Sequence, residues 1–205
     1  EQTLSGAKQR IIANLDKGIQ KKKLSPAERD TTLANLHFEP DLAKAATDAE
    51  LIIEAVPEVL DIKLDLLAKV DEMTPEYAII ATNTSSFSIV DIAKAVSDPT
   101  RVIGTHFFNP VHKMPLVEVV RGEETSEETA AETSALALAL GKTPVVVRDV
   151  PGFLVNRILG PYLDEAARLV DGERVPHLVG TEDVLSLRDV NRTEGPCGSP
   201  GGRPR

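Results

Sequence analysis

The sequence has few aromatic residues and a single thiol, and both shortages limit what the protein can be. Aromatic residues make up 3% of its 205 residues and Trp is missing, so a core must be built from Val, Ile, Leu and Ala. The one cysteine, Cys197, excludes an internal disulfide framework. A chain without disulfides is typical of a reducing compartment, so we expect a cytoplasmic protein.

Positive charge and long apolar runs are also scarce. Lys and Arg number 23 against 32 Asp and Glu, which gives a formal net charge of −9. This acidity argues against the phosphate-binding surface of a nucleic-acid partner. No apolar run approaches the roughly 18 residues that cross a bilayer, so we expect no membrane partner either. Hydrophobic residues nevertheless reach 41% and charged residues 27%, which are the proportions of a globular protein.

Short apolar runs alternate with helical stretches from residue 51 onward. We predict strands at 51–56, 78–82, 102–105, 116–120 and 145–147 and helices at 60–73, 89–96 and 125–140. Such alternation is typical of βαβ units in a parallel sheet that is buried on both faces. The fold class is therefore α/β, with an incomplete Rossmann-like parallel sheet followed by the first helix of an all-α domain.

Helices are predicted on both sides of this region. An amphipathic pattern over 7–24 and a capping box at Ser25-Pro26-Ala27-Glu28 predict a helical hairpin. A brief helix is expected after Pro40, and a long one over 153–170 after the hinge-like Asp149–Gly152. We therefore expect a domain at 1–150, the start of a helical domain at 151–171, and a divergent, disordered tail at 172–205.

Polar residues follow three of the predicted strands, where an open α/β sheet has its ligand crevice. Glu58 follows the first strand, Asn83-Thr84-Ser85-Ser86 the second, and His106-Phe107-Phe108-Asn109-Pro110 the third. Asn, Ser and Pro are also ordinary turn residues, so each position alone is more typical of a loop than of a site.

His106 is the most informative of these residues because a carboxylate lies in the next predicted strand. Glu118 stands among four aliphatic residues, and a buried acid needs a partner. His106 is the obvious candidate, and a carboxylate that orients an imidazole commonly supports a general base.

Three reaction classes use such a pair. A serine hydrolase would add Ser85 as nucleophile, but no Gly-x-Ser-x-Gly elbow surrounds it. A zinc site would need His106, His112 and Glu118, whose spacing matches no common ligand pattern. A dehydrogenase would use the histidine to take a proton from an alcohol while a cofactor accepts hydride, and it alone fits the parallel sheet without a further assumption.

Over about residues 5–171 the sequence resembles the 3-hydroxyacyl-CoA dehydrogenases of fatty acid β-oxidation, because five motifs occur in the order and spacing of that family. The segment Val111–Pro115 has a weaker similarity to the bacterial multifunctional proteins of the same pathway. The five motifs are Ile53-Glu54-Ala55-Val56, Asn83-Thr84-Ser85-Ser86, His106-Phe107-Phe108-Asn109-Pro110, Pro115-Leu116-Val117-Glu118-Val119 and Pro151-Gly152-Phe153-Leu154-Val155-Asn156-Arg157. The resemblance implies NAD-dependent oxidation of an L-3-hydroxyacyl-CoA to the 3-ketoacyl-CoA, with an acyl-CoA substrate and a homodimer.

The resemblance also implies the roles of individual residues. It implies His106 as general base oriented by Glu118, and Ser85 and Asn156 as substrate contacts. The positions implied to contact NAD are Glu58, Lys63, Ser85 and Asn109. For Lys63 a solvated helix charge is the other interpretation. The basic residues Lys17 and Lys21–Lys23 match the hairpin from which the family contacts CoA, although solvation and the helix dipole explain them equally.

The sequence departs from the family pattern at both ends. The family begins with a strand, a Gly-x-Gly-x-x-Gly turn and a helix, and these 205 residues contain no such segment. We therefore expect a fragment that binds NAD weakly and exposes unpaired strand edges. A non-catalytic relative that keeps the scaffold as a binding module remains an alternative, as does, less favoured, a Ser85-dependent acyl hydrolase.

Overall fold

The computed structural model describes residues 2–171, so the predictions for 172–205 lie outside the described residues. Contacts divide the chain into two units, Glu1–Pro151 and Gly152–Arg205. In the second unit the described secondary structure is helix α7, Val155–Asp171. It begins two residues later than the predicted helix, because Gly152 and Phe153 adopt positive φ angles that are not helical.

The first unit contains a five-stranded sheet in which the strands follow one another in chain order. The strands are β1 Leu51–Glu54, β2 Ile79–Thr82, β3 Val102–Phe107, β4 Leu116–Arg121 and β5 Thr143–Arg148. Strands β1, β2 and β3 are parallel, β4 is antiparallel to β3, and β5 is parallel to β4. The sheet is thus mostly parallel, as predicted. The β3–β4 pair is the exception because the short segment 108–115 joins these strands without a crossover helix.

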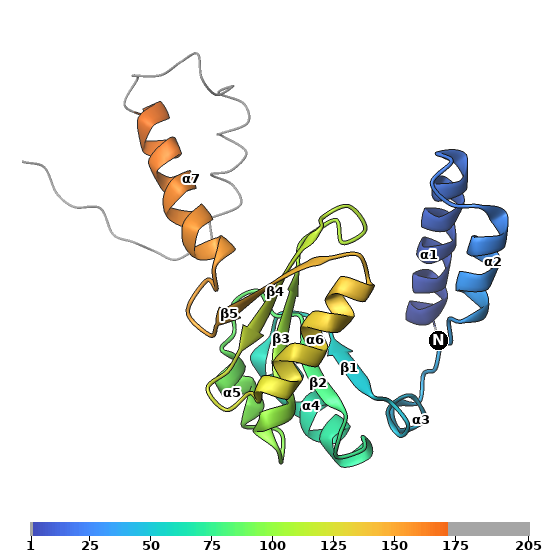
Figure 1. The fold of residues 1–205 in the computed structure, drawn as a ribbon, viewed down its shortest axis with the longest axis horizontal. Coiled ribbons are helices and arrows are strands. Elements are labelled where there is room, and N and C mark those ends of the chain that lie inside the picture. Colours follow the sequence, from blue (N-terminus) through green and yellow to red (C-terminus); the bar gives the residue numbers. More distant parts are fainter. Residues whose placement is uncertain (1, 172–205) are drawn as a thin grey trace, which may run out of the picture. The chain divides into compact units, whose positions relative to one another are not determined.

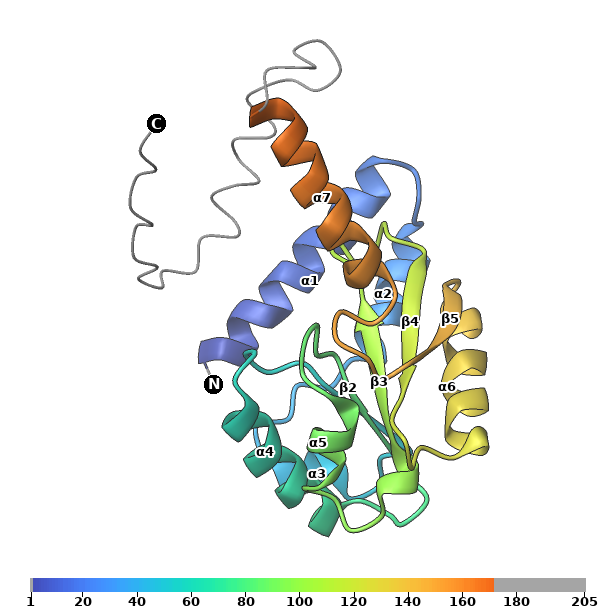
Figure 2. The ribbon, with the colours of Figure 1, turned by 90° about the vertical axis from the view of Figure 1, so that its left-hand side faces the viewer.

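Helices cover both faces of this sheet (Figures 1 and 2). Helices α4 (Leu60–Met73) and α5 (Ile89–Ala93) lie on one face, and α6 (Glu127–Ala139) lies on the other. On the α6 face, Ala130 packs against a cluster that includes Ile103 of β3. On the opposite face, Gly104 lies against Ile89, with no room for a side chain between them. Residues alternate between the faces of a strand, so His106 shares the α5 face with Gly104.

The remaining helices precede β1, apart from a short turn before β3. They are α1 Gln2–Gln20, α2 Pro26–Ala34, α3 Leu42–Ala46 and the 3₁₀ turn Pro99–Arg101. Ser25 and Glu28 form the predicted capping box of α2. Helix α3 begins under Asp41, whose carboxylate accepts two backbone N–H groups. Among residues 2–171, no helix has the length and apolar character that a membrane crossing requires.

Candidate active site

His106 and Glu118 form a buried pair in the middle of the sheet. The sequence pattern predicts a strand that ends before His106, and this is wrong: β3 continues to Phe107. The strand continues because antiparallel pairing sets His106 directly opposite Glu118 in β4. Imidazole Nδ1 lies 2.6 Å from carboxylate Oε2, and the Glu118 side chain has no solvent exposure. A carboxylate accepts hydrogen bonds, so the tautomer that fits this contact carries its proton on Nδ1.

The pair is shielded from solvent. The ring of Phe108 lies 4.6 Å from the His106 ring, centroid to centroid, with the two planes tilted by 58°. His106 itself is 5% exposed. The pair is therefore a desolvated imidazole held at Nδ1 by a buried carboxylate.

Glu58 holds the loop that follows β2. Its Oε1 accepts hydrogen bonds from the Ser85 backbone N–H at 2.9 Å and the Ser86 hydroxyl at 3.1 Å, and also from the Thr84 hydroxyl. Burial would raise the pKa of Glu58, but hydrogen bonds from Thr84 and Ser85 and the nearby Lys63 ammonium outweigh it, and its pKa is lowered. Glu58 is therefore an anion around which the loop is ordered.

Lys63 lies beneath Glu58 and is almost completely buried. Its side chain is 1% exposed, so the alternative of a solvated helix charge is wrong. Its Nζ donates to Glu54 Oε1 at 2.9 Å and lies 3.1 Å from Glu58 Oε2. Glu54 in turn accepts a hydrogen bond from the Thr82 hydroxyl at 2.7 Å. A buried carboxylate, an ammonium and a second carboxylate therefore connect β1, α4 and the end of β2.

Asn83 ties the same loop to the histidine strand. Its Oδ1 accepts the backbone N–H of Phe107, the residue after His106, at 3.0 Å. The loop over 83–86 is therefore fixed on one side by Glu58 and on the other by β3. Thus the structure brings together Glu58, Lys63 and Ser85, and links them through Asn83 to the strand of His106 and Glu118.

The sequence analysis placed Glu54 in a family motif and Asn83 among the polar residues of the crevice, but it gave neither a role of its own in this site. A usable signal existed for Glu54. It ends a run of apolar residues in β1, and a buried acid needs a partner, as was argued for Glu118. Asn83 gave no comparable signal, because an Asn after a strand is most often a turn residue.

The remaining predicted site residues are Asn109 and Asn156. Asn109 is exposed in the loop after β3. Asn156 is exposed on α7, in the second unit. Among residues 2–171, no group of three or more His, Cys, Asp and Glu side chains could hold a metal ion, so His106, His112 and Glu118 do not form the zinc site considered above.

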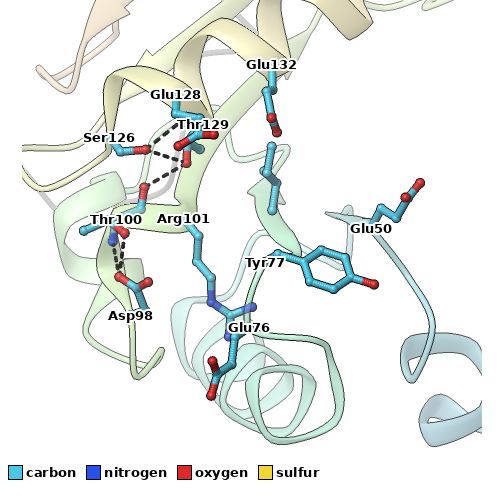
Figure 3. A pocket seen from close by; sticks show the side chains of 11 residues that line it. Glu50, Glu76, Tyr77, Asp98, Thr100, Arg101, Ser126, Glu128, Thr129 and Glu132 are labelled. Atoms are coloured by element: carbon cyan, nitrogen blue, oxygen red, sulfur yellow. Dashed lines mark hydrogen bonds between the residues drawn. The ribbon is translucent and has the colours of Figure 1, made fainter.

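A separate pocket of about 520 Å³ lies at the opposite, amino-terminal ends of the strands (Figure 3). Five carboxylates are among its lining residues: Glu50, Glu76, Asp98, Glu128 and Glu132. Its one cation, Arg101, already donates to Pro75 O at 3.2 Å and Ala78 O at 3.0 Å and pairs with Asp71. This negative potential repels phosphate groups, so the pocket does not fit a nucleotide.

Comparisons with known proteins agree with this geometry. The profile of the family described as "3-hydroxyacyl-CoA dehydrogenase, NAD binding domain" matches residues 1–150. The fatty acid oxidation complex subunit alpha of Shewanella amazonensis is 46% identical over 165 residues, 80% of this chain and 23% of that protein. Its counterpart in Acinetobacter baumannii is 50% identical over 149 residues, 72% of this chain and 20% of that protein. The chain thus spans about a quarter or less of the length of these relatives.

Solved structures share the fold as well. The (S)-3-hydroxybutyryl-CoA dehydrogenase PaaH1 from Ralstonia eutropha has a TM-score of 0.82 and 37% identity, over 89% of this chain and 63% of that one. The 3-hydroxybutyryl-CoA dehydrogenase from Escherichia coli K12 has a TM-score of 0.81 and 39% identity, over 84% of this chain and 36% of that one. With a family profile that covers residues 1–150, the chain belongs to the NAD-binding domain family of the 3-hydroxyacyl-CoA dehydrogenases.

Proposed function

We propose that the protein acts in the NAD-dependent oxidation of an L-3-hydroxyacyl-CoA to the 3-ketoacyl-CoA, as a part of fatty acid β-oxidation. The observation that carries the proposal is the buried His106–Glu118 pair, with Nδ1 and Oε2 2.6 Å apart. Its position near the carboxyl end of β3, beside the ordered 83–86 loop, is where open α/β sheets bind ligands.

In this proposal His106 is the general base. Glu118 orients the imidazole at Nδ1, and His106 takes the proton of the substrate's 3-hydroxyl. The imidazolium that forms lies against a carboxylate with no solvent exposure, and this anion stabilises it as the proton arrives. A positioned base of this kind contributes on the order of 10²–10⁴ to the rate.

The donors and acceptors after β1 and β2 fit a nucleotide. Glu58 keeps 38% of its side chain exposed, next to the exposed Ser85 and Ser86, and a carboxylate beside hydroxyls suits ribose hydroxyl groups. We assign cofactor contacts to Glu58, Ser85 and Asn109, and Lys63 belongs to the same site through Glu58. When bound, NAD accepts the hydride that leaves C3 of the substrate.

Substrate recognition is proposed for Ser85 and for Asn156 of the second unit. The cations Lys17 and Lys21–Lys23 are exposed at the end of α1 and suit the phosphates of CoA. As in the family, we propose a homodimer and a location in the cytoplasm.

The test is oxidation of 3-hydroxybutyryl-CoA, followed by NADH formation at high NAD. We expect turnover by the wild-type chain and a loss of kcat of about 10²–10⁴ in His106→Ala. The exposed His112→Ala serves as the control and keeps wild-type kcat. Equal rates in wild type and His106→Ala, or no turnover in either, would contradict the proposal, and the second result favours a non-catalytic binding module.

A further inference from the structure

Lys63 has already used its hydrogen-bonding capacity within the protein. An ammonium has three N–H donors. Its Nζ lies 2.9 and 3.1 Å from the two oxygens of Glu54, 3.1 Å from Glu58 Oε2 and 3.4 Å from Val56 O. These acceptors take up every donor, and the side chain is 1% exposed. The ammonium is therefore held within the protein by two carboxylates.

The two oxygens of Glu58 have different partners. Oε2 faces Lys63, and Oε1 receives the Thr84 hydroxyl, the Ser85 N–H and the Ser86 hydroxyl. The orientation of one carboxylate thus determines whether the 84–86 loop has its acceptor. With 38% of the Glu58 side chain exposed, solvent competes for this carboxylate unless a neighbour holds it.

Glu54 fixes the ammonium from below. Its Oε1 accepts the Val56 N–H at 2.7 Å, and its Oε2 accepts the Thr82 hydroxyl at 2.7 Å. Glu54 and Glu58 together carry two negative charges against the single positive charge of Lys63. Without the ammonium these carboxylates repel each other, and the half-exposed Glu58 is the one that can move away.

We propose that Lys63 is a positioning residue: anchored by Glu54, it holds Glu58 in the orientation that orders the Ser85 loop. The relevance of this loop to catalysis rests on the function proposed above. The structural part of the inference concerns the loop alone, and it can be tested without turnover.

The experiment follows the backbone amide signals of Ser85 and Ser86 by NMR in the ¹⁵N-labelled 205-residue chain. The pH dependence of these signals reports the protonation of the Glu58 carboxylate. This assignment holds only if the pH dependence disappears in Glu58→Gln. In Lys63→Met we expect the titration midpoint to rise and the Ser85 amide to exchange with solvent about tenfold faster, the effect of losing a hydrogen bond to a charged group.

Removing Lys63 alone leaves Glu54 as a buried charge, so the decisive variant is Glu54→Gln/Lys63→Met. It restores a neutral interior, and we expect it to fold while keeping the raised midpoint and the faster Ser85 exchange. Leu67→Ala, at a fully buried position of the same helix, controls for lost stability and keeps the wild-type midpoint.

A folded double variant with wild-type midpoint and exchange overturns the positioning role. Since no substrate is involved, that result leaves the proposed reaction standing, and a failed dehydrogenase assay leaves the positioning role standing.

Discussion

The His106–Glu118 pair makes a prediction about stability that is independent of any assay of turnover. Replacing His106 by Leu removes the hydrogen bond that Glu118 accepts across a separation of 2.6 Å. Leaving a buried group without its hydrogen-bond partner costs about 1–3 kcal/mol of unfolding free energy, and more when the group is charged. Replacing both residues, as His106→Leu/Glu118→Met, also removes the buried charge and costs less than the two single changes together. Hydrogen bonds to charged groups contribute about 1.5–3 kcal/mol, and we expect the coupling energy to lie in that range.

The measurement is urea unfolding of the wild type, both single variants and the double variant. The control is the same cycle at the exposed pair of Asp91 on α5 and Lys94 at its C-cap, whose side chains are 54% and 69% exposed. Exposed pairs of this kind couple by less than about 1 kcal/mol. If the His106–Glu118 coupling is no larger than that of the control, the claim of a strong buried pair is refuted.

Three further perturbations test other parts of the structure. Gly104→Ala places a Cβ 2.8 Å from Ile89 Cδ1 and Val120 Cβ, so we expect about 1–3 kcal/mol of destabilisation in urea unfolding; unchanged stability would contradict the tight packing. Ser25→Ala removes the cap of α2 and lowers stability by about 1 kcal/mol, with faster amide exchange confined to that helix; an unaltered exchange pattern would contradict it. Because the pKa of Glu58 is lowered by folding, its contribution is present above the ordinary Glu pKa and lost as pH falls through the folded value. The free energy of unfolding should therefore fall less at acidic pH in Glu58→Gln than in the wild type. The same pH dependence in both proteins would contradict the lowered pKa.

The helices and strands could be predicted where hydrophobic periodicity and caps agree. The structure has α4 over the predicted 60–73, and α6 begins under Ser126, within the predicted start of that helix. The end of β3 was missed for a physical reason. His106 reads as a loop residue by its polarity alone, and only the carboxylate opposite it in β4 makes its place in a strand favourable.

The burial of Lys63 could not be predicted, because a lysine near the start of a helix has the same local pattern whether or not it is solvated. Its state depends on Glu54 and Glu58, which the β1–α4 connection folds back onto it. The pairing of Glu118 with His106 was predicted because a buried acid between aliphatic residues admits few solutions. The sequence thus indicates a site where a charged residue stands in a pattern that predicts burial, as Glu118 does. It gives no such signal where the pattern fits an exposed side chain equally well, as for Lys63.

The central claim is that His106 removes the hydroxyl proton as C3 of the substrate gives up its hydride. The most direct measurement uses L-3-hydroxybutyryl-CoA with deuterium at C3 and mass spectrometry of the nicotinamide product. We predict that the wild-type chain transfers deuterium to NAD and that the amount falls about 10²–10⁴-fold in His106→Ala within the same time. Deuterium transfer at the same rate in both proteins, or none with the wild type, would contradict the account.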